Sequence, residues 1–119
     1  VYDLEYLYKG GDIPDRKSGI AFLEKAIGRD SEVLRSFSPS YRANELNLPI
    51  MILHGEEDPR APVEHAYAMM NALDQAKKPY EKLIFKKEGH GLFDTEAKNA
   101  LYESLLNFFA QSLQPVAKP

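Results

Sequence analysis

The chain has 119 residues, 44% of them hydrophobic, and a formal net charge of −3 from 18 acidic and 15 basic side chains. This length is enough for one hydrophobic core, so we expect residues 1–119 to form a single domain. The chain lacks the excess of basic residues that would favour nucleic acid as a partner. No apolar run in the sequence approaches the ~20 residues that span a membrane. Because cysteine is absent, disulfides and thiolate metal sites are excluded.

The first part of the sequence predicts helices separated by turns. An amphipathic helix is predicted over 16–29, because apolar residues recur at helical spacing: Ile20, Phe22, Leu23, Ala26 and Ile27. Gly28 is suited to end it. Asp30 or Ser31 can then cap a short helix over 32–37. This part of the chain therefore contributes helices rather than strands.

The middle of the chain predicts a strand, a helix and a second strand. Leu48–Gly55 is a nearly continuous apolar run closed by glycine, as expected of a parallel strand buried on both faces. A helix is predicted over 62–78, between Pro62 in its first turn and Pro79 just beyond its end. Its apolar face consists of Val63, Ala66, Tyr67, Met70 and Leu73. With Tyr80–Phe85 as the second strand, the helix is the crossover that parallel neighbours need, which indicates an α/β fold.

A last helix is predicted over 95–113. Its apolar residues lie mostly on one face: Ala97, Leu101, Leu105, Phe108 and Phe109. We expect this helix to pack across the sheet, with Phe108 and Phe109 as core anchors. Residues 114–119 are expected to fray.

Asp58 and His90 each follow one of the two predicted strands, and 90 − 58 = 32 positions separate them. Parallel strands end at the same edge of a sheet, where open α/β sheets keep their chemistry, so the two side chains can meet. A carboxylate that accepts the Nδ1 proton of an imidazole fixes its tautomer, and Nε2 can then take a proton from a nucleophile. We expect the two groups at hydrogen-bond distance, about 2.6 to 3.2 Å. The order of acid before histidine is that of α/β-hydrolases.

The sequence around these two residues resembles a known family. His54-Gly55-Glu56-Glu57-Asp58-Pro59-Arg60-Ala61-Pro62, followed after one helix by Glu88-Gly89-His90-Gly91, is similar to the C-terminal part of prolyl oligopeptidase family hydrolases. The family includes acylaminoacyl peptidases and dipeptidyl aminopeptidases. Its usual pattern is His-Gly, two variable residues, Asp, two variable residues, Val-Pro and a distant Gly-His, from which this chain departs by Ala61 in place of Val. The resemblance covers residues 36 to 113.

The resemblance implies the C-terminal part of an α/β-hydrolase catalytic domain in which Asp58 and His90 are the acid and base of a serine peptidase. It also implies that Arg60, two residues after the acid, can point a side-chain donor at a substrate carbonyl. The expected partner is a peptide or ester substrate, and neither a metal nor a cofactor is expected. An esterase or lipase of the same fold shares these motifs, and a non-catalytic binding module derived from it is a third interpretation.

The nucleophile is not found in this sequence. No Gly-x-Ser-x-Gly elbow occurs. None of the serines in the chain has the flanking glycines of such a turn: Ser18, Ser31, Ser36, Ser38, Ser40, Ser104 and Ser112. We therefore expect the nucleophile upstream of Val1 and interpret the chain as a fragment that is inactive alone. A sheet cut in this way exposes an unpaired strand edge, so we expect the fragment to form a homo-oligomer.

The remaining polar residues have simpler interpretations. His54 ends a strand and is expected to be structural, whereas His65 lies early on a helix and is expected to be solvated. The acidic turn 56–58 offers hard oxygen ligands for Mg²⁺ or Ca²⁺, but three acids in one turn more often form a solvated loop. Three tyrosines near the start could line a substrate pocket, although packing is the commoner role: Tyr2, Tyr6 and Tyr8.

Overall fold

The computed structural model describes residues 1–113, so the expected fraying of residues 114–119 lies outside the described part of the chain. In chain order the elements are η1 (Tyr6–Tyr8), α1 (Lys17–Ile27), α2 (Ser31–Ser36), η2 (Pro39–Tyr41), η3 (Ala43–Glu45), β1 (Met51–Gly55), α3 (Glu64–Gln75), β2 (Glu81–Phe85) and α4 (Thr95–Ser112), where η denotes a 3₁₀ helix. Among these described helices, none combines the length and apolar character needed to cross a membrane.

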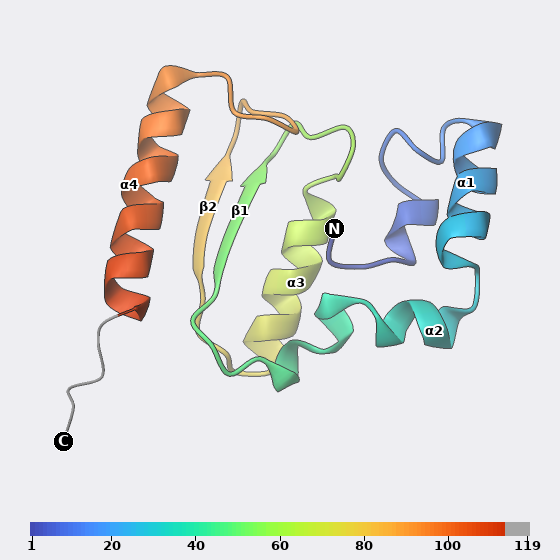
Figure 1. Ribbon diagram of the computed structural model, residues 1–119, viewed down its shortest axis with the longest axis horizontal. Helices are drawn as coiled ribbons and strands as arrows, with labels where there is room; N and C mark the ends of the chain where they lie inside the picture. The colour runs from blue at the N-terminus through green and yellow to red at the C-terminus, as the bar shows by residue number, and fades with distance from the viewer. Residues whose placement is uncertain (114–119) are drawn as a thin grey trace.

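The two strands form a parallel pair joined by α3, which confirms the predicted strand–helix–strand unit of an α/β fold (Figure 1). Gly55 lies opposite Phe85, so both strands end at the same edge of the sheet. β1 begins at Met51 rather than at Leu48. Leu48 is exposed, and Pro49 has no N–H to donate to a neighbouring strand.

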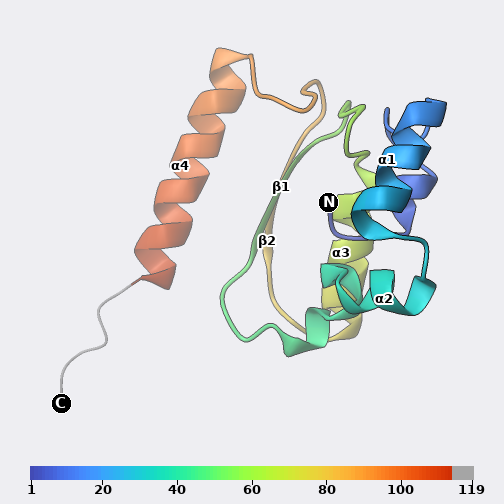
Figure 2. The ribbon, with the colours of Figure 1, turned by 45° about the vertical axis from the view of Figure 1, so that its right-hand side comes forward.

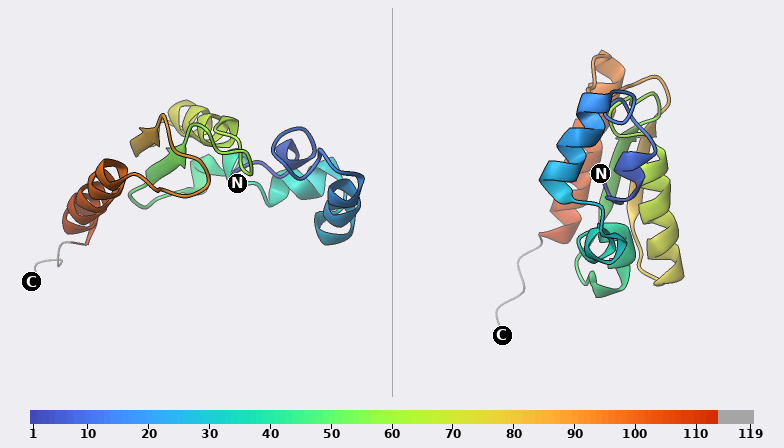
Figure 3. Two further views of the ribbon diagram at one scale, coloured as in Figure 1. Left: turned by 90° about the horizontal axis from the view of Figure 1, so that it is seen from above. Right: turned by 90° about the vertical axis from the view of Figure 1, so that its right-hand side faces the viewer.

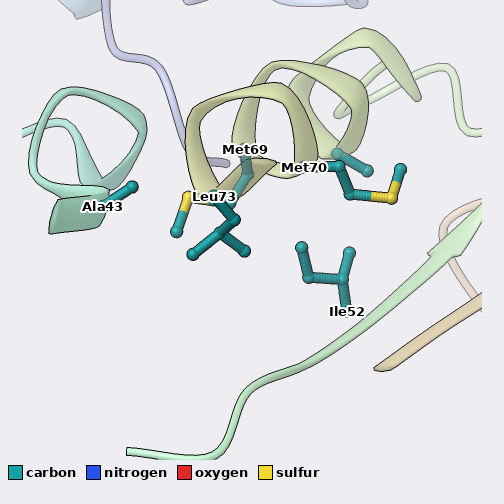
Figure 4. Packing of buried hydrophobic residues seen from close by; sticks show 6 residues of the cluster. Ala43, Ile52, Met69, Met70 and Leu73 are labelled. Carbon is teal, nitrogen blue, oxygen red and sulfur yellow. The ribbon is translucent and has the colours of Figure 1, made fainter. Parts of the chain in front are cut away.

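A hydrophobic core lies between α3 and one face of the sheet (Figure 4). Its buried residues are Ala43, Ile52, Ala66, Met69, Met70 and Leu73. The α3 members follow an i, i+3, i+4, i+7 spacing, which places them along one stripe of the helix. Tyr67 was predicted on this stripe but is exposed, because the stripe passes through Met69 instead. The prediction that β1 is buried on both faces was also wrong, since Met51 and Leu53 are only half-buried.

α4 stands on the opposite side of the sheet from α3 (Figure 2). It buries none of its residues, so the prediction that Phe108 and Phe109 anchor the core was wrong. Phe108 is half-buried and Phe109 is 49% exposed. The physical reason is width: two strands about 4.8 Å apart cannot cover a helix about 10 Å across. A second apolar row on α4 is exposed: Tyr102, Leu106, Phe109 and Leu113.

The N-terminal helices lie beside α3, at the far end of an elongated molecule from α4 (Figure 3). The principal extents of the molecule are 55 × 36 × 23 Å. Leu23 of α1 and Leu34 of α2 are buried, whereas Phe22, predicted on the apolar face of α1, is exposed. Gly28 ends α1 with a positive φ of 72°, as predicted. Asp30 caps α2 by accepting a backbone N–H of its first turn.

Candidate active site

The turns that follow β1 and β2 lie together at one edge of the sheet (Figure 1). The N–H of Glu57 donates to the carbonyl oxygen of Glu88 at 3.0 Å, so the pairing of the strands continues into the turns. Gly55 makes this close approach feasible, because a Cβ at that position would collide with the carbonyl oxygens of Glu88 and Gly89. Backbone packing thus requires glycine at position 55, in the pair His54-Gly55.

His90 and Asp58 meet at this edge. The Nδ1 atom of His90 lies 2.9 Å from Oδ2 of Asp58, within the distance that the sequence predicts. The Asp58 side chain is 7% exposed and the His90 side chain 59% exposed. The site therefore combines a buried carboxylate with an imidazole that faces solvent.

The carboxylate of Asp58 is fixed by its own turn. Its Oδ1 atom accepts the N–H of Arg60 at 2.9 Å and the N–H of Ala61 at 3.0 Å. Burial raises the pKa of Asp58, but the hydrogen bonds from Ala61, His90 and Arg60 outweigh it and hold the pKa below its usual range. Asp58 is therefore ionised at neutral pH, the state that accepts a hydrogen bond from an imidazole.

His54, on β1, forms a hydrogen bond to the same turn. Its Nε2 atom lies 2.7 Å from the carbonyl oxygen of Ala61 and 3.8 Å from Oδ2 of Asp58. Because a carbonyl can only accept, Nε2 of His54 carries a proton and donates it to Ala61. This contact agrees with the structural role expected for His54.

His65 is not solvated, so its sequence-based prediction was wrong. The side chain is fully buried on α3, and its Nδ1 atom accepts the N–H groups of Tyr2 and Asp3, each at 3.4 Å. The ring of Tyr6 packs edge-on against it with centroids 5.0 Å apart. Burial lowers the pKa of His65, which keeps the ring neutral and able to accept. His65 therefore fastens the N-terminal segment to α3.

Arg60 lies on the outer side of the Asp58 turn. Its side chain is exposed, and its Nε atom lies 3.6 Å from Oδ2 of Asp12. A pocket of about 400 Å³ adjoins it and is also lined by Arg16 and Phe22. An exposed guanidinium beside a pocket can reach a ligand, so a substrate role for Arg60 stays open as a prediction.

A second pocket, of about 350 Å³, adjoins the Asp58–His90 pair. Tyr2, Leu92 and Leu101 contribute to its walls. Within residues 1–113, no serine lines this pocket.

The three tyrosines near the start have different surroundings. Tyr2 lines the pocket beside the Asp58–His90 pair. Tyr6 packs on His65, and the hydroxyl of Tyr8 donates to the carbonyl oxygen of Gly28 at 2.6 Å. The pocket interpretation thus fits Tyr2, whereas Tyr6 and Tyr8 make contacts within the fold.

The acidic turn 56–58 does not converge on one point. Glu56 and Glu57 are exposed, whereas the Asp58 carboxylate points inward to its turn and to His90. In the part of the chain that the structure describes, no group of three or more His, Cys, Asp or Glu residues could hold a metal ion.

Sequence reasoning missed Glu88. This residue is 6% exposed, and its carboxylate accepts the N–H groups of Phe93 at 2.8 Å and Asp94 at 3.1 Å. A signal was present, because an acidic residue lies directly before the Gly-His pair. Without the loop geometry, however, its partners could not be identified.

A carboxylate and an imidazole hydrogen-bonded at the carboxyl edge of a parallel strand–helix–strand unit define part of an α/β-hydrolase of the serine hydrolase class. Comparison with known proteins gives the family. Residues 1–116 match the prolyl oligopeptidase family, and the chain belongs to it.

Individual relatives agree with this assignment. The chain is 36% identical over 73 residues to the uncharacterized peptidase YuxL of Bacillus subtilis, covering 61% of this chain and 11% of that protein. It is 29% identical over 110 residues to dipeptidyl peptidase family member 6 of Caenorhabditis elegans, covering 92% of this chain and 13% of that protein. The uncomplexed acylaminoacyl peptidase of Pyrococcus horikoshii has the same fold, with a TM-score of 0.85 at 24% identity over 100% of this chain and 20% of that chain. The chain thus spans between 11% and 20% of these proteins.

The close approach at Gly55 predicts different effects for two glycine substitutions. Gly55→Ala places a Cβ against backbone oxygens and is expected to lower the free energy of unfolding by about 1–3 kcal/mol, as overpacking does. Gly89→Ala is the control, because its added Cβ would lie 3.5 Å from the nearest atom, an ordinary contact. Urea denaturation monitored by circular dichroism measures both. Equal losses in the two variants would contradict this account of the turn packing.

The lowered pKa of Asp58 predicts a pH-dependent contribution to stability. A folded-state pKa below the unfolded value of about 3.9 means that ionised Asp58 stabilises the fold above that value. The contribution disappears as pH falls through the folded pKa. The difference in unfolding free energy between the wild type and Asp58→Asn should therefore shrink as pH falls below about 3.9 toward the folded pKa. Urea titrations across this range test it, and a difference that does not change with pH would contradict it.

Proposed function

We propose that this chain carries the general base and the orienting acid of a Ser-Asp-His serine peptidase, with the serine supplied by a segment outside these 119 residues. The observation that carries the proposal is the 2.9 Å contact between His90 Nδ1 and Asp58 Oδ2 at the carboxyl edge of adjacent parallel strands. We further propose that residues 1–119 are the C-terminal portion of one catalytic domain. The small share of each relative that the chain covers supports this division.

The proposed reaction assigns each proton a place. The serine Oγ attacks the carbonyl carbon of the substrate while His90 Nε2 takes the hydroxyl proton, which gives a tetrahedral intermediate. His90 then donates that proton to the leaving amine as the C–N bond breaks, leaving an acyl-enzyme. Water then attacks the acyl carbon while His90 Nε2 takes one of its protons, and His90 gives that proton to the serine Oγ as the ester bond breaks and the acid product leaves. Asp58 stays ionised throughout and stabilises the imidazolium, for which its lowered pKa is suited.

The exposure of His90 supports the proposal that the serine hydroxyl approaches it from outside this chain. Its side chain is 59% exposed although Nδ1 is occupied by Asp58, so the rest of the ring is open to an approaching hydroxyl. The adjoining pocket of about 350 Å³ has apolar walls at Leu92 and Leu101, where part of a substrate can be placed. The oxyanion hole, like the serine, is proposed to come from a segment outside these 119 residues.

Peptides are the proposed substrates, because the relatives named above are peptidases. Arg60 is the proposed substrate-binding residue. Its guanidinium is exposed at the end of the Asp58 turn and its nearest carboxylate partner, Asp12, is 3.6 Å away. Such a loose contact leaves N–H groups of Arg60 available to donate to a substrate carbonyl.

Substitution of the acid–base pair in the complete polypeptide tests the proposal. His90→Ala removes the proton acceptor and Asp58→Asn favours the wrong tautomer, so each is expected to lower kcat by about 10⁴-fold or more. Arg60→Ala should raise KM with little change in kcat, because it removes a substrate contact rather than a proton carrier. Steady-state hydrolysis of peptide and ester substrates measures these values.

Exposed neighbours provide matched controls for these variants. Glu57→Gln repeats the chemistry of Asp58→Asn one residue away, and Lys87→Ala truncates an exposed side chain close to His90. Both should keep wild-type kcat. Full activity in folded His90→Ala would overturn the proposal, hydrolysis of esters alone would assign an esterase of the same fold, and a complete polypeptide without turnover would favour a binding module.

The isolated chain is proposed to be inactive and to self-associate. Its sequence contains no Gly-x-Ser-x-Gly elbow to supply a nucleophile for His90, and within residues 1–113 the outer edge of β1 pairs with no strand. The exposed apolar row on α4 adds surface that favours association: Tyr102, Leu106, Phe109 and Leu113. A two-fold dimer is the commonest closed assembly.

Sedimentation velocity of the purified chain at micromolar concentration, combined with an esterase assay, measures both properties. A dimer or larger species without turnover is the expected result. A well-folded monomer would contradict the association, and turnover abolished by a serine-directed phosphonate would reveal a nucleophile within these residues.

A further inference from the structure

Glu88 is a buried carboxylate that the proposed reaction does not use. It lies two residues before His90 and is 6% exposed. Its Oε2 atom accepts the N–H of Phe93 at 2.8 Å, and its Oε1 atom accepts the N–H of Asp94 at 3.1 Å. Burying a carboxylate is costly unless hydrogen bonds compensate, so these two bonds account for its presence.

The two bonds close the loop that carries His90. Glu88 begins this loop, while Phe93 and Asp94 end it directly before α4, so one side chain fastens both ends. The backbone oxygen of Glu88 also accepts the N–H of Glu57, the residue before Asp58, at 3.0 Å. Glu88 therefore joins the loop of the base, the turn of the acid and the start of α4.

We infer that Glu88 is a positioning residue that holds the His90 ring on Asp58, an inference that rests on the function proposed above. His90 needs such support because it is 59% exposed and lies between Gly89 and Gly91, which place few restrictions on the backbone. A misplacement of about 1 Å in a catalytic group can cost roughly 100-fold in rate. Closing the loop thus fixes the direction of Nε2.

The loop requires a carboxylate rather than an amide at this position. Two backbone N–H groups converge on the side chain, and each needs an acceptor. Glutamine has the same size but only one oxygen, so its NH₂ group would face a second donor. Glu88→Gln therefore breaks one bond of the closure without opening a cavity.

Kinetics and hydrogen exchange of the complete polypeptide test the inference. Glu88→Gln should lower kcat between about tenfold and 100-fold with KM changed less than about twofold, because the base is displaced while substrate contacts remain. Exchange measured by mass spectrometry should become faster in the peptide that spans residues 89–94 and stay unchanged in α3. Glu103→Gln is the control, since Glu103 is exposed in the middle of α4.

A second pair of variants removes a donor instead of the acceptor. Asp94 has φ of −70°, which proline can adopt, and its side chain caps α4 by accepting the N–H of Ala97 at 2.9 Å. Asp94→Ala and Asp94→Pro both lose this cap, but only the proline variant loses the N–H that Glu88 accepts. Asp94→Pro should therefore lower kcat further than Asp94→Ala, whether or not Glu88→Gln folds.

His90→Ala in the same assay separates failure of this inference from failure of the proposed function. If His90→Ala is inactive while Glu88→Gln keeps kcat within about twofold, the base is correct and Glu88 does not position it. Equal kcat values for Asp94→Pro and Asp94→Ala would also overturn the inference, as would a Glu88→Gln defect confined to KM. An active His90→Ala would instead overturn the proposed function itself.

Discussion

The parallel pairing of β1 with β2 is the constraint on which the candidate site depends. Because Gly55 lies opposite Phe85, both strands end level with each other and their turns leave from the same edge. The N–H of Glu57 then reaches the carbonyl oxygen of Glu88, which extends the pairing past the strands. A shift of one residue in this register would move the Asp58 turn and the His90 loop apart. The 2.9 Å contact of the pair is thus a consequence of strand register.

The core explains why this register is kept. The crossover helix α3 packs Met69, Met70 and Leu73 on Ile52, the one fully buried side chain of β1. Since side chains alternate between the faces of a strand, slipping β1 by one residue would turn Ile52 away from α3 and replace it with a neighbour. Hydrophobic burial on one face of the sheet therefore fixes the geometry of polar groups at its edge.

The sequence predicted the parts of this structure that depend on local pattern, and it failed where burial depends on distant elements. The strand–helix–strand unit, the Gly28 terminator and the Asp30 cap follow from spacing and residue type. The burial of His65 does not, because the backbone N–H groups it accepts come from Tyr2 and Asp3, far away in the chain.

The same limit applies to α4 and to the site. Phe108 and Phe109 look like core residues by composition, but a two-stranded sheet is too narrow to bury them. The meeting of Asp58 and His90 could be predicted, since it requires only that two parallel strands end together. The contacts of Glu88 could not be predicted, because its carboxylate oxygens accept N–H groups that only the folded loop brings close.

Asp58 and His90 are held by different means, and the difference suits the chemistry proposed for them. Asp58 is buried, and its carboxylate is fixed by two N–H groups of its own turn and by His90, which suits the proposed role of an orienting group that keeps its charge. In the proposed reaction His90 exchanges protons with a nucleophile and a leaving group, which requires that its ring stay open to them. The observed loop meets this requirement, because His90 is exposed at its centre while the Glu88 carboxylate joins its two ends.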